Sequence, residues 1–443
     1  MRDYRPQARI AVSAIALCCA AACPAAALTG AVGPTAPTPP GGLHLEDALA
    51  LALARNWELQ SAGSDLAVAR AAERTAREWP NPTASFSTSH VHLDGRSDAT
   101  PLGDTYWTRG YDSVGQLGEL IELGGKRGAR RAVAGASTRA AAARLADARR
   151  TVVAGTVRAY AAAALATANA GIAEQSAAYL RDEARIAAIR LEAGDISRAD
   201  RDQIEIAAAR LELDAESART AALGERLALE ELLGLAHPTG DVVLADSLEA
   251  LAEHAAVSSP PPAAGERADL VAARAELARA TGELRLQRAA RIPDPTLTVQ
   301  AEHAPPDRPN SVGGSVALTV PFLGRNAGAI AGAETGHEAA EREVRRVAAQ
   351  VAADSAAARS AFAEAVARWR RYRDDLRPRS DAIRRAVSLA FERGGASLLD
   401  LLEAQRNDND VRLEATRAAN DVAVAAADLA AACSTFTPEA SRP

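Results

Sequence analysis

The sequence predicts a mainly α-helical protein with a small β part, arranged as two internal repeats. Three observations support this fold class. Aromatic residues make up only 3% of the chain and Met occurs once, prolines gather in a few short clusters, and one order of helices, strands and glycine turns occurs twice. The remaining residues are mostly Ala, Leu, Val, Arg and Glu, a composition typical of long helices that pack through small side chains.

Charge and cysteine content argue against several classes of protein. A net charge of -6 over 443 residues argues against a nucleic-acid binder, which needs a basic face. Three of the four cysteines lie within the first 23 residues and Cys433 stands alone, so we expect no disulfide framework and no cysteine-rich metal site. No nucleophile–base arrangement, phosphate loop or zinc motif occurs, which predicts neither an enzyme nor a bound cofactor.

The N-terminus has the pattern of a signal peptide. Arginines precede an apolar stretch over Ile10–Ala22, and Ala25–Ala27 offers an A-x-A cleavage site, so we expect residues 1–27 to be removed on export. A cut before Cys23 is the alternative, and it would expose that cysteine for lipidation. No other apolar run is long enough for a transmembrane helix, whereas transmembrane strands are not excluded.

Proline clusters separate the segments of the chain. Two long stretches contain almost no proline, which predicts very long helices. In the second stretch Pro378 stands alone, and we expect it to kink the helix there. We divide the chain into a signal peptide, a Pro-rich N-terminal linker, a first repeat, an inter-repeat linker or equatorial segment, a second repeat and a C-terminal tail, at residues 1–27, 28–42, 43–235, 236–265, 266–433 and 434–443.

Each repeat is expected to start with a helix, over about Leu45–Glu78 and about Arg267–Arg291. The helices end at the signatures Pro80-Asn81-Pro82 and Pro293-Asp294-Pro295. Alternating segments rich in Ser, Thr, Val and Gly follow, and they predict a β-hairpin in each repeat, at about 83–120 and about 296–320.

A long helix follows each hairpin. Lys126–Ala193 and Asn326–Arg393 each contain about 68 residues, which would span roughly 100 Å at about 1.5 Å per residue. Each runs to a second glycine turn, at Gly194 or Gly394, and a returning helix follows. Helices of this length need lateral partners along their whole length.

The predicted strands are about ten residues long, close to the ~9–11 that cross a bilayer when tilted. Four strands cannot close a barrel, so other copies of the chain would have to supply the rest. Together with the signal peptide and the long helices, they suggest an outer-membrane pore on a periplasmic helical tube. A secreted coiled-coil spacer or adaptor without a pore is the alternative from another class.

The ordered set of motifs resembles the TolC family of outer-membrane efflux proteins over about Leu43–Cys433. Ile121–Arg127 is similar to the segment typical of the branch that serves cobalt-zinc-cadmium resistance pumps, and Val320–Asn326 is similar to its second-half counterpart. The sequence departs from the family at two prolines often found before the first helices, where it has Trp57 and Ala268.

This resemblance implies a homotrimer in outer-membrane lipid, with a twelve-stranded β-barrel continuous with a periplasmic twelve-helix α-barrel. It implies a passive exit duct that receives substrate from a proton-driven inner-membrane pump through a periplasmic adaptor. The branch implies heavy-metal cations as substrate, and drugs or other small organic molecules are the alternative.

The second glycine turns are candidate sites for adaptor contact. Gly194 with Ser197, and Gly394 with Ser397, mark these helix-turn tips. In both halves the serine begins an S-x-x-D capping box, with Asp200 in the first half and Asp400 in the second.

The acids beyond these turns are candidates for a periplasmic gate and selectivity site. In the family, acids at the positions of Asp400 and Glu403 ring the periplasmic aperture, and we place Asp200 with them. Helix capping alone is the alternative interpretation of Asp200 and Asp400. It does not account for Glu403, which lies one turn further along the face of Asp400.

Three histidines in the hairpins are weak candidates for metal contact. His90 and His92 share one strand face, and His303 matches the position of His90 when the Pro-x-Pro signatures are aligned. Ordinary lumen or rim histidines are the favoured interpretation. The basic run Arg368–Arg373 is interpreted as a solvated helix face with interhelical ion pairs rather than an anion site.

Overall fold

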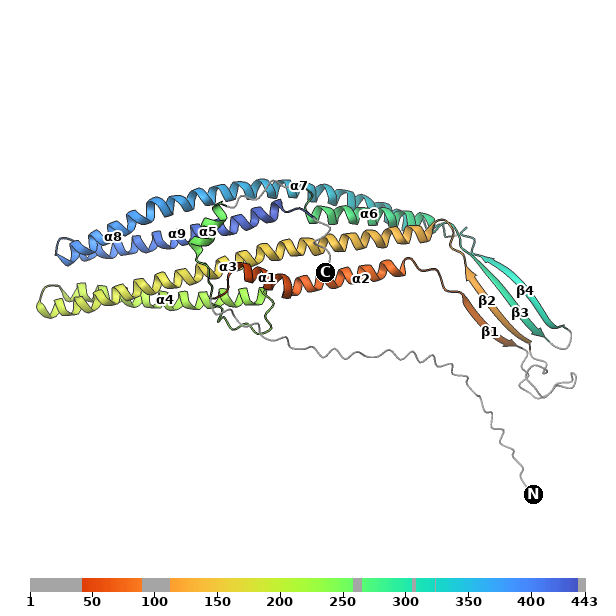
Figure 1. Ribbon diagram of the computed structural model, residues 1–443, viewed down its shortest axis with the longest axis horizontal. Coiled ribbons are helices and arrows are strands. Elements are labelled where there is room, and N and C mark those ends of the chain that lie inside the picture. The colour runs from red at the N-terminus through yellow and green to blue at the C-terminus, as the bar shows by residue number, and fades with distance from the viewer. Residues whose placement is uncertain (1–41, 90–111, 258–264, 305–307, 323, 437–443) are drawn as a thin grey trace, which may run out of the picture. The chain divides into compact units, whose positions relative to one another are not determined.

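A computed structural model describes residues 42–89, 112–257, 265–304, 308–322 and 324–436, all within one compact unit, Thr38–Pro443 (Figure 1). The predicted signal peptide, Cys23, His90, His92 and the Pro-rich stretch 258–262 lie outside the described residues.

The described part of the chain is mostly helical with one four-stranded sheet, as the composition predicts. The first half contains α1 (Leu45–Arg55), α2 (Trp57–Thr75), β1 (Thr83–Ser89), β2 (Asp112–Leu120), α3 (Lys126–Ala193), α4 (Arg198–Leu232) and α5 (Leu248–Val257). The second half contains α6 (Ala268–Ala289), β3 (Pro295–Ala304), β4 (Arg308–Leu318), α7 (Ala327–Arg371), a π-helical turn (Tyr372–Leu376), α8 (Arg377–Glu392) and α9 (Leu398–Cys433).

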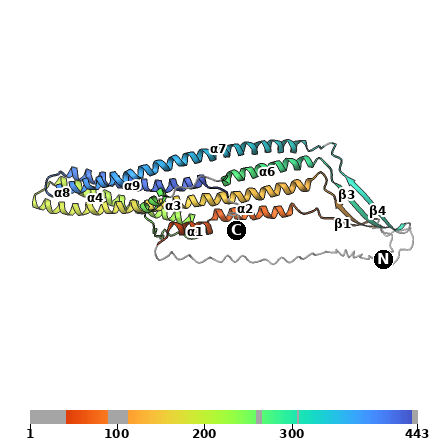
Figure 2. The same cartoon turned by 45° about the horizontal axis from the view of Figure 1, so that its top comes forward.

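The helices lie side by side along their lengths. Next to the sheet the order is α2, α3, α6, α7, and towards the helical turns it is α4, α3, α9, α8 (Figures 1 and 2). Small residues permit this close approach. A Cβ atom at Gly282 of α6 would come within 2.9 Å of the Val133 side chain on α3. Most of the buried apolar residues in the described chain are alanines, in agreement with the prediction of long helices that pack through small side chains.

The helix α3 contains an 18-residue window with a mean hydropathy of 1.2, so by length and composition it is apolar enough to cross a membrane. This is weak evidence for a span, because a helix that packs against α4, α6 and α9 passes the same test.

Two small apolar clusters stabilise the middle of the helical part. In one, the fully buried Tyr160 of α3 packs with Leu43, Leu229 and Leu233. In the other, α5 packs on α7 and α9 through Leu248, Ala252, Trp369, Ala419 and Val422. The two clusters tie the N-terminal and inter-repeat segments to the long helices.

The four strands form one antiparallel sheet in the order β1-β2-β3-β4. Both predicted hairpins are confirmed, and β2 pairs with β3 to join them. The register places Leu117 opposite Val299, and Val299 opposite Gly314. Side chains alternate between the two faces along each strand, so this register assigns every residue to one face.

Two predicted helices differ from the structure. The helix expected over Leu45–Glu78 is interrupted at Asn56, whose Oδ1 accepts hydrogen bonds from the amides of Glu58 and Leu59 at 3.0 and 3.2 Å. Its Nδ2 donates to the carbonyl of Leu232 at 2.9 Å. Asn56 therefore ends α1, caps α2 and fixes both to the end of α4.

The first long helix has the predicted bounds, whereas the second is divided. The π-helical turn separates α7 from α8 and ends at Leu376, two residues before Pro378. Proline lacks an N–H and its ring crowds the preceding turn, which explains a local change of helix type at this point. The helix α5, within the predicted inter-repeat linker, has no counterpart among the sequence-based predictions.

Candidate functional site: the helical turns and the sheet

The two helical turns have closely similar backbone geometry. Gly194 and Gly394 have φ values of 80° and 74°, in the left-handed region that favours glycine. The next amide donates back to the helix in both turns, from Asp195 to Arg190 O at 2.9 Å and from Gly395 to Ala390 O at 2.8 Å. Glycine therefore ends both long helices in the manner of a C-terminal cap.

The capping boxes predicted after these turns are confirmed. Asp400 Oδ2 accepts from the amide and the hydroxyl of Ser397 at 2.9 and 2.7 Å, and the amide of Asp400 donates to Ser397 Oγ at 3.2 Å. Ser197 and Asp200 repeat the arrangement at the start of α4. Hydrogen bonds from Ser397 hold the pKa of Asp400 below its usual value. Both aspartates therefore cap helices, whether or not they also face a pore.

Glu403 takes no part in capping. It is exposed and lines a groove of about 850 Å³ between α3, α4 and α9. The groove has an apolar floor that includes Leu180 and Leu402, and charged residues of both signs. Gln405, also in the groove, is 5% exposed, and its Oε1 has no hydrogen-bond partner among the described residues.

Polar contacts join α3 to α8 and α9 near the turns. The hydroxyl groups of Tyr179 and Ser388 lie 3.1 Å apart, and Ser176 Oγ donates to Asn409 Oδ1 at 2.6 Å. Burial raises the pKa of Glu183, which lies on the same part of α3. Together with the hydrogen bond that Arg412 of α9 donates to Gln175 Oε1 at 2.6 Å, these contacts link the α3–α4 pair to the α8–α9 pair in this part of the chain.

A buried carboxylate between α8 and α9 has no counterpart among the sequence-based predictions. Asp408 is 2% exposed, its Oδ1 accepts from Ser380 Oγ at 3.0 Å, and its Oδ2 lies 3.2 Å from Arg384 Nε. The available signal was spacing, because Leu401, Gln405 and Asp408 follow a helical period along the buried stripe of α9. Two polar residues on the buried stripe of a helix indicate a polar contact with the neighbouring helix rather than a purely apolar one.

The segment similar to the metal-resistance branch meets the second Pro-x-Pro signature at the junction of helices and sheet. Lys126 Nζ lies 2.7 Å from Asp294 Oδ2, and the amide of Leu123 donates to Asp294 Oδ1 at 2.8 Å. Arg130, one helical turn after Lys126, pairs with Glu122. The arrangement joins the start of α3 to the start of β3 and gives this segment a structural role.

The sheet has one apolar and one polar face. Phe86, Leu117, Val299, Val312 and Val316 share one face and are exposed, although water disfavours such a surface. Ser85, Gln116, Gln300 and Thr298 lie on the other face. Alternation of this kind is the pattern of strands with lipid on one side and a polar interior on the other.

His303 lies on the apolar face, opposite Ser113, with Nδ1 3.1 Å from Asn310 Oδ1. It does not belong to the polar face with Gln300. In the described ranges, no group of three or more His, Cys, Asp or Glu side chains is arranged to hold a metal ion.

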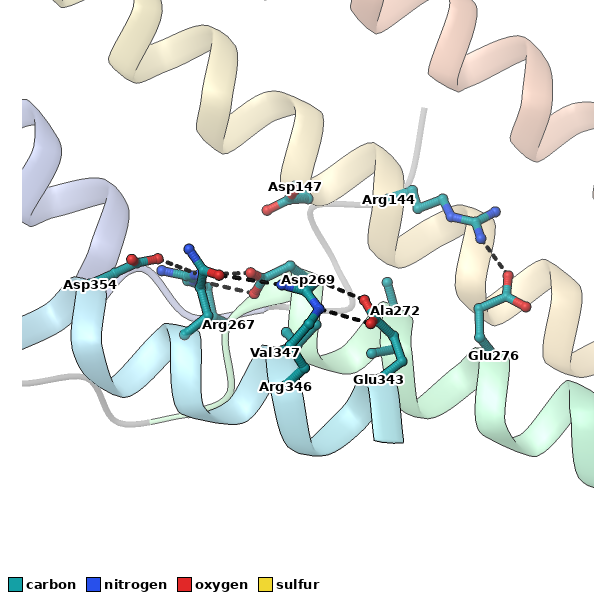
Figure 3. Close-up of a pocket in the computed structure, with 12 residues that line it drawn as sticks. Arg144, Asp147, Arg267, Asp269, Ala272, Glu276, Glu343, Arg346, Val347 and Asp354 are labelled. Carbon is teal, nitrogen blue, oxygen red and sulfur yellow. Dashed lines mark hydrogen bonds and ion pairs between the residues drawn. The ribbon is translucent and has the colours of Figure 1, made fainter. Parts of the chain in front are cut away.

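A charged pocket of about 580 Å³ lies between α3, α6 and α7 (Figure 3). Arg267, 5% exposed, donates to both carboxylate oxygens of Asp269 at 2.9 and 2.7 Å and to Asp354 at 3.0 Å. Arg346 pairs with Glu343 at 2.7 Å. Each of these charged groups has a partner of opposite sign, so the pocket does not offer an unsatisfied ligand site.

Comparison with known proteins agrees with this geometry. The family model for outer membrane efflux proteins matches residues 48–235 and 260–435, and the chain belongs to this family. The cobalt-zinc-cadmium resistance protein CzcC of Cupriavidus metallidurans is 27% identical over 371 residues, which cover 83% of this chain and 84% of that protein.

Solved outer-membrane channels share the fold. The open state of MtrE from Neisseria gonorrhoeae superimposes with a TM-score of 0.70 at 20% identity, covering 88% of each chain. VceC from Vibrio cholerae gives 0.69 at 19% identity, covering 88% of this chain and 95% of that one.

The protein is therefore an outer-membrane efflux channel protein. Its relatives are channels rather than enzymes, and family members are trimers that work with periplasmic adaptors and inner-membrane pumps.

Proposed function

We propose that three copies of this chain form the passive exit duct of a tripartite efflux system that exports heavy-metal cations. The observation that carries the proposal is the four-stranded sheet with one apolar face and two outer strands, β1 and β4. Unpaired strand edges are not tolerated in lipid, so β4 of one copy would pair with β1 of the next until the barrel closes.

The charges of the helical part also favour contact between neighbouring copies of the chain. The helices α4 and α8 lie at opposite edges of the helical layer near the turns (Figure 1). Nine acidic and five basic residues lie in α4, whereas α8 has four basic and two acidic residues. This complementarity favours contact of α4 in one copy with α8 in the next.

Heavy-metal cations are the favoured substrate because of two similarities. The chain is similar to a cobalt-zinc-cadmium resistance protein over most of its length, and the segment Ile121–Arg127 resembles the one typical of that branch. Deleting the gene should sensitise cells to cobalt, zinc, cadmium or copper. Increased toxicity of dyes and antibiotics alone would favour organic substrates instead.

The tips at Gly194–Ser197 and Gly394–Ser397 are the proposed contacts for the adaptor. In a trimer, three copies each of Asp400 and Glu403 would surround one axis, with Asp200 nearby in the other helix pair. Like charges in a narrow throat repel one another and attract cations. We propose that this ring makes the closed end of the duct cation-selective, and that Glu403, free of any capping role, contributes most directly.

A further inference from the structure

Exposed apolar side chains extend from the sheet to its junction with the helices, on the right of Figure 1. Val316 and Leu318 of β4 lie on the apolar face of the sheet and are exposed. Val320 and Phe322 follow β4 and are 67% and 71% exposed, and Trp79, which precedes β1, is 64% exposed. In an outer-membrane channel protein with periplasmic helices, this junction lies at the lipid headgroups of the inner leaflet.

Basic side chains join the ends of the helices at the same junction. Arg127 of α3 donates through Nε and Nη2 to the carbonyl of Arg77, just after α2, at 3.2 and 2.6 Å. Arg291, just after α6, donates through Nε to the carbonyl of Arg325, just before α7, at 3.2 Å. A carbonyl oxygen satisfies the hydrogen bond of a guanidinium group but does not neutralise its charge. These contacts therefore fix cations at the junction without pairing them.

Carboxylates at the junction do not balance these cations. Lys126 and Arg130 already use the nearby acids, and neither α3 nor α7 has an acidic residue in its first turn. In the described part of the junction, the arginines without a carboxylate partner are Arg127, Arg131, Arg291 and Arg325, and the glutamates without a cationic partner are Glu78 and Glu119. The arginines outnumber the glutamates, so the junction attracts anions although the whole chain has a net charge of -6.

One of these arginines is stacked on the exposed tryptophan. The guanidinium carbon of Arg127 lies 3.9 Å from the centroid of the Trp79 ring. This cation–π contact holds the indole beside an unpaired positive charge, and Arg131 lies one turn further along the same face of α3. Tryptophan favours the boundary between lipid and water, and paired guanidinium N–H groups match the geometry of a phosphate group. A phospholipid supplies partners for both side chains.

We propose that this junction binds anionic phospholipids of the inner leaflet. The arginines Arg127, Arg291 and Arg325 contact the lipid phosphate, while Trp79 and Phe322 lie at the level of the glycerol backbone and the upper acyl chains. Lipid is favoured over a protein partner because the surface is continuous with the apolar face of the sheet. The proposal uses the outer-membrane location of the family and does not depend on a pore or on the exported substrate.

Lipid retention by the purified full-length protein in a mild non-ionic detergent tests this proposal. The protein is mixed with dioleoylphosphatidylglycerol or dioleoylphosphatidylcholine, which share their acyl chains and differ in charge, and native mass spectrometry measures the bound lipid. We expect the parent to retain the anionic lipid at least about fivefold better, because each basic residue near a headgroup contributes to the attraction. The preference should fall as sodium chloride is added, because salt screens exposed charges.

Two pairs of substitutions show whether the arginines of the junction cause the preference. Arg291→Gln with Arg325→Gln should reduce it to about twofold or less. Arg198→Gln with Arg393→Gln removes the same charge at the helical turns, where neither arginine has a carboxylate partner among the described residues, and should leave it unchanged. Trp79→Ala should weaken retention of both lipids to a similar extent, because the ring contacts lipid of either charge.

Circular dichroism confirms that each variant is folded. If the double variant at the junction does not fold, Arg325→Gln alone takes its place, because the Arg325 side chain has no hydrogen-bond or ion-pair partner among the described residues. The single variant should then lower the preference at least about twofold.

Three results would overturn the proposal. The first is equal retention of the two lipids by the parent, or retention of neither, which would favour a protein partner. The second is a preference that the junction variant keeps or that the control at the helical turns also loses. The third is displacement of phosphatidylglycerol by an equal concentration of inorganic phosphate, which would indicate a site for free anions. A lost preference in the junction variant supports the lipid site even if the protein conducts no ions.

Discussion

The ammonium group of Lys126 lies 2.7 Å from the carboxylate of Asp294, so the only lysine of the chain joins two of its sequence motifs. Lys126 Nζ also donates to the carbonyl of Ile292 at 2.5 Å. The side chains of Lys126 and Asp294 are 13% and 20% exposed. The junction between the long helix and the sheet therefore depends on a contact largely shielded from water.

Replacing Lys126 with Ala should lower the stability of this junction. A charged hydrogen-bonded contact of this kind contributes about 2 kcal/mol, so we expect a clear fall in apparent melting temperature in detergent. Asp294→Ala should have a similar effect, and the double variant should be no worse than the more damaging single variant. Arg185→Ala, whose pair with Asp182 is exposed, serves as the control. Strictly additive effects would contradict the proposed coupling.

Asp408→Ala should be more damaging than changes to the neighbouring exposed ion pair. The variant leaves Arg384 without its buried partner and Ser380 without its acceptor, at a cost of roughly 3 kcal/mol. Arg385→Ala, which removes a pair with Asp381 on the surface of α8, should change stability by less than about 1 kcal/mol. Thermal unfolding followed by circular dichroism compares the two. Equal losses of stability in the two variants would show that Asp408 does not hold α8 and α9 together.

These two contacts show how far sequence reasoning reaches. Helix lengths, hairpins and turns could be predicted because proline, glycine and alternation act locally, and α3 begins and ends where those residues place it. The capping boxes were predictable for the same reason. Asp408 and Ser380 are 28 residues apart across a turn, and no local rule pairs them. The helix α5 is short, and its position depends on burial against Trp369 rather than on its own pattern.

Stability should depend on pH through the contact of His44 with Asp246. The hydrogen bond to Asp246 holds the pKa of His44 above the usual value for histidine. Burial acts to raise the pKa of Asp246, but hydrogen bonds from His44, Leu45 and Tyr160 hold it below the usual value for aspartate. Protonated His44 thus contributes stability that is complete below about pH 6.5 and lost as the pH rises through its raised pKa. Ionised Asp246 contributes stability that is present above about pH 3.8 and lost as the pH falls through its lowered pKa.

The apparent melting temperature should therefore be highest between those two limits and decline towards pH 8. His44→Gln should remove the decline in melting temperature between about pH 6.5 and 8. It should leave the fall in melting temperature at acidic pH unchanged. A His44→Gln profile identical to the parent profile above pH 6 would mean that another group causes the dependence.

Glu403 provides a cleaner test of the gate than Asp400, because only Asp400 caps a helix. In planar bilayers, Glu403→Gln should reduce the preference for cations over anions and weaken block by multivalent cations from the periplasmic side. The melting temperature of Glu403→Gln should differ little from that of the parent, because substitutions of exposed residues usually change stability little. Asp200→Asn, which alters the equivalent cap of α4, is the matched control for stability. Unchanged selectivity in Glu403→Gln would place the gate elsewhere.

Single-channel recording of the purified full-length protein in planar bilayers tests the central claim most directly. The account predicts a small, mostly closed, cation-preferring conductance. The sheets of three copies would form the pore, and the polar contacts of α3 with α8 and α9 would hold its helical end shut. Absence of any conductance from protein shown to be inserted in the bilayer would contradict the duct and favour a spacer without a pore.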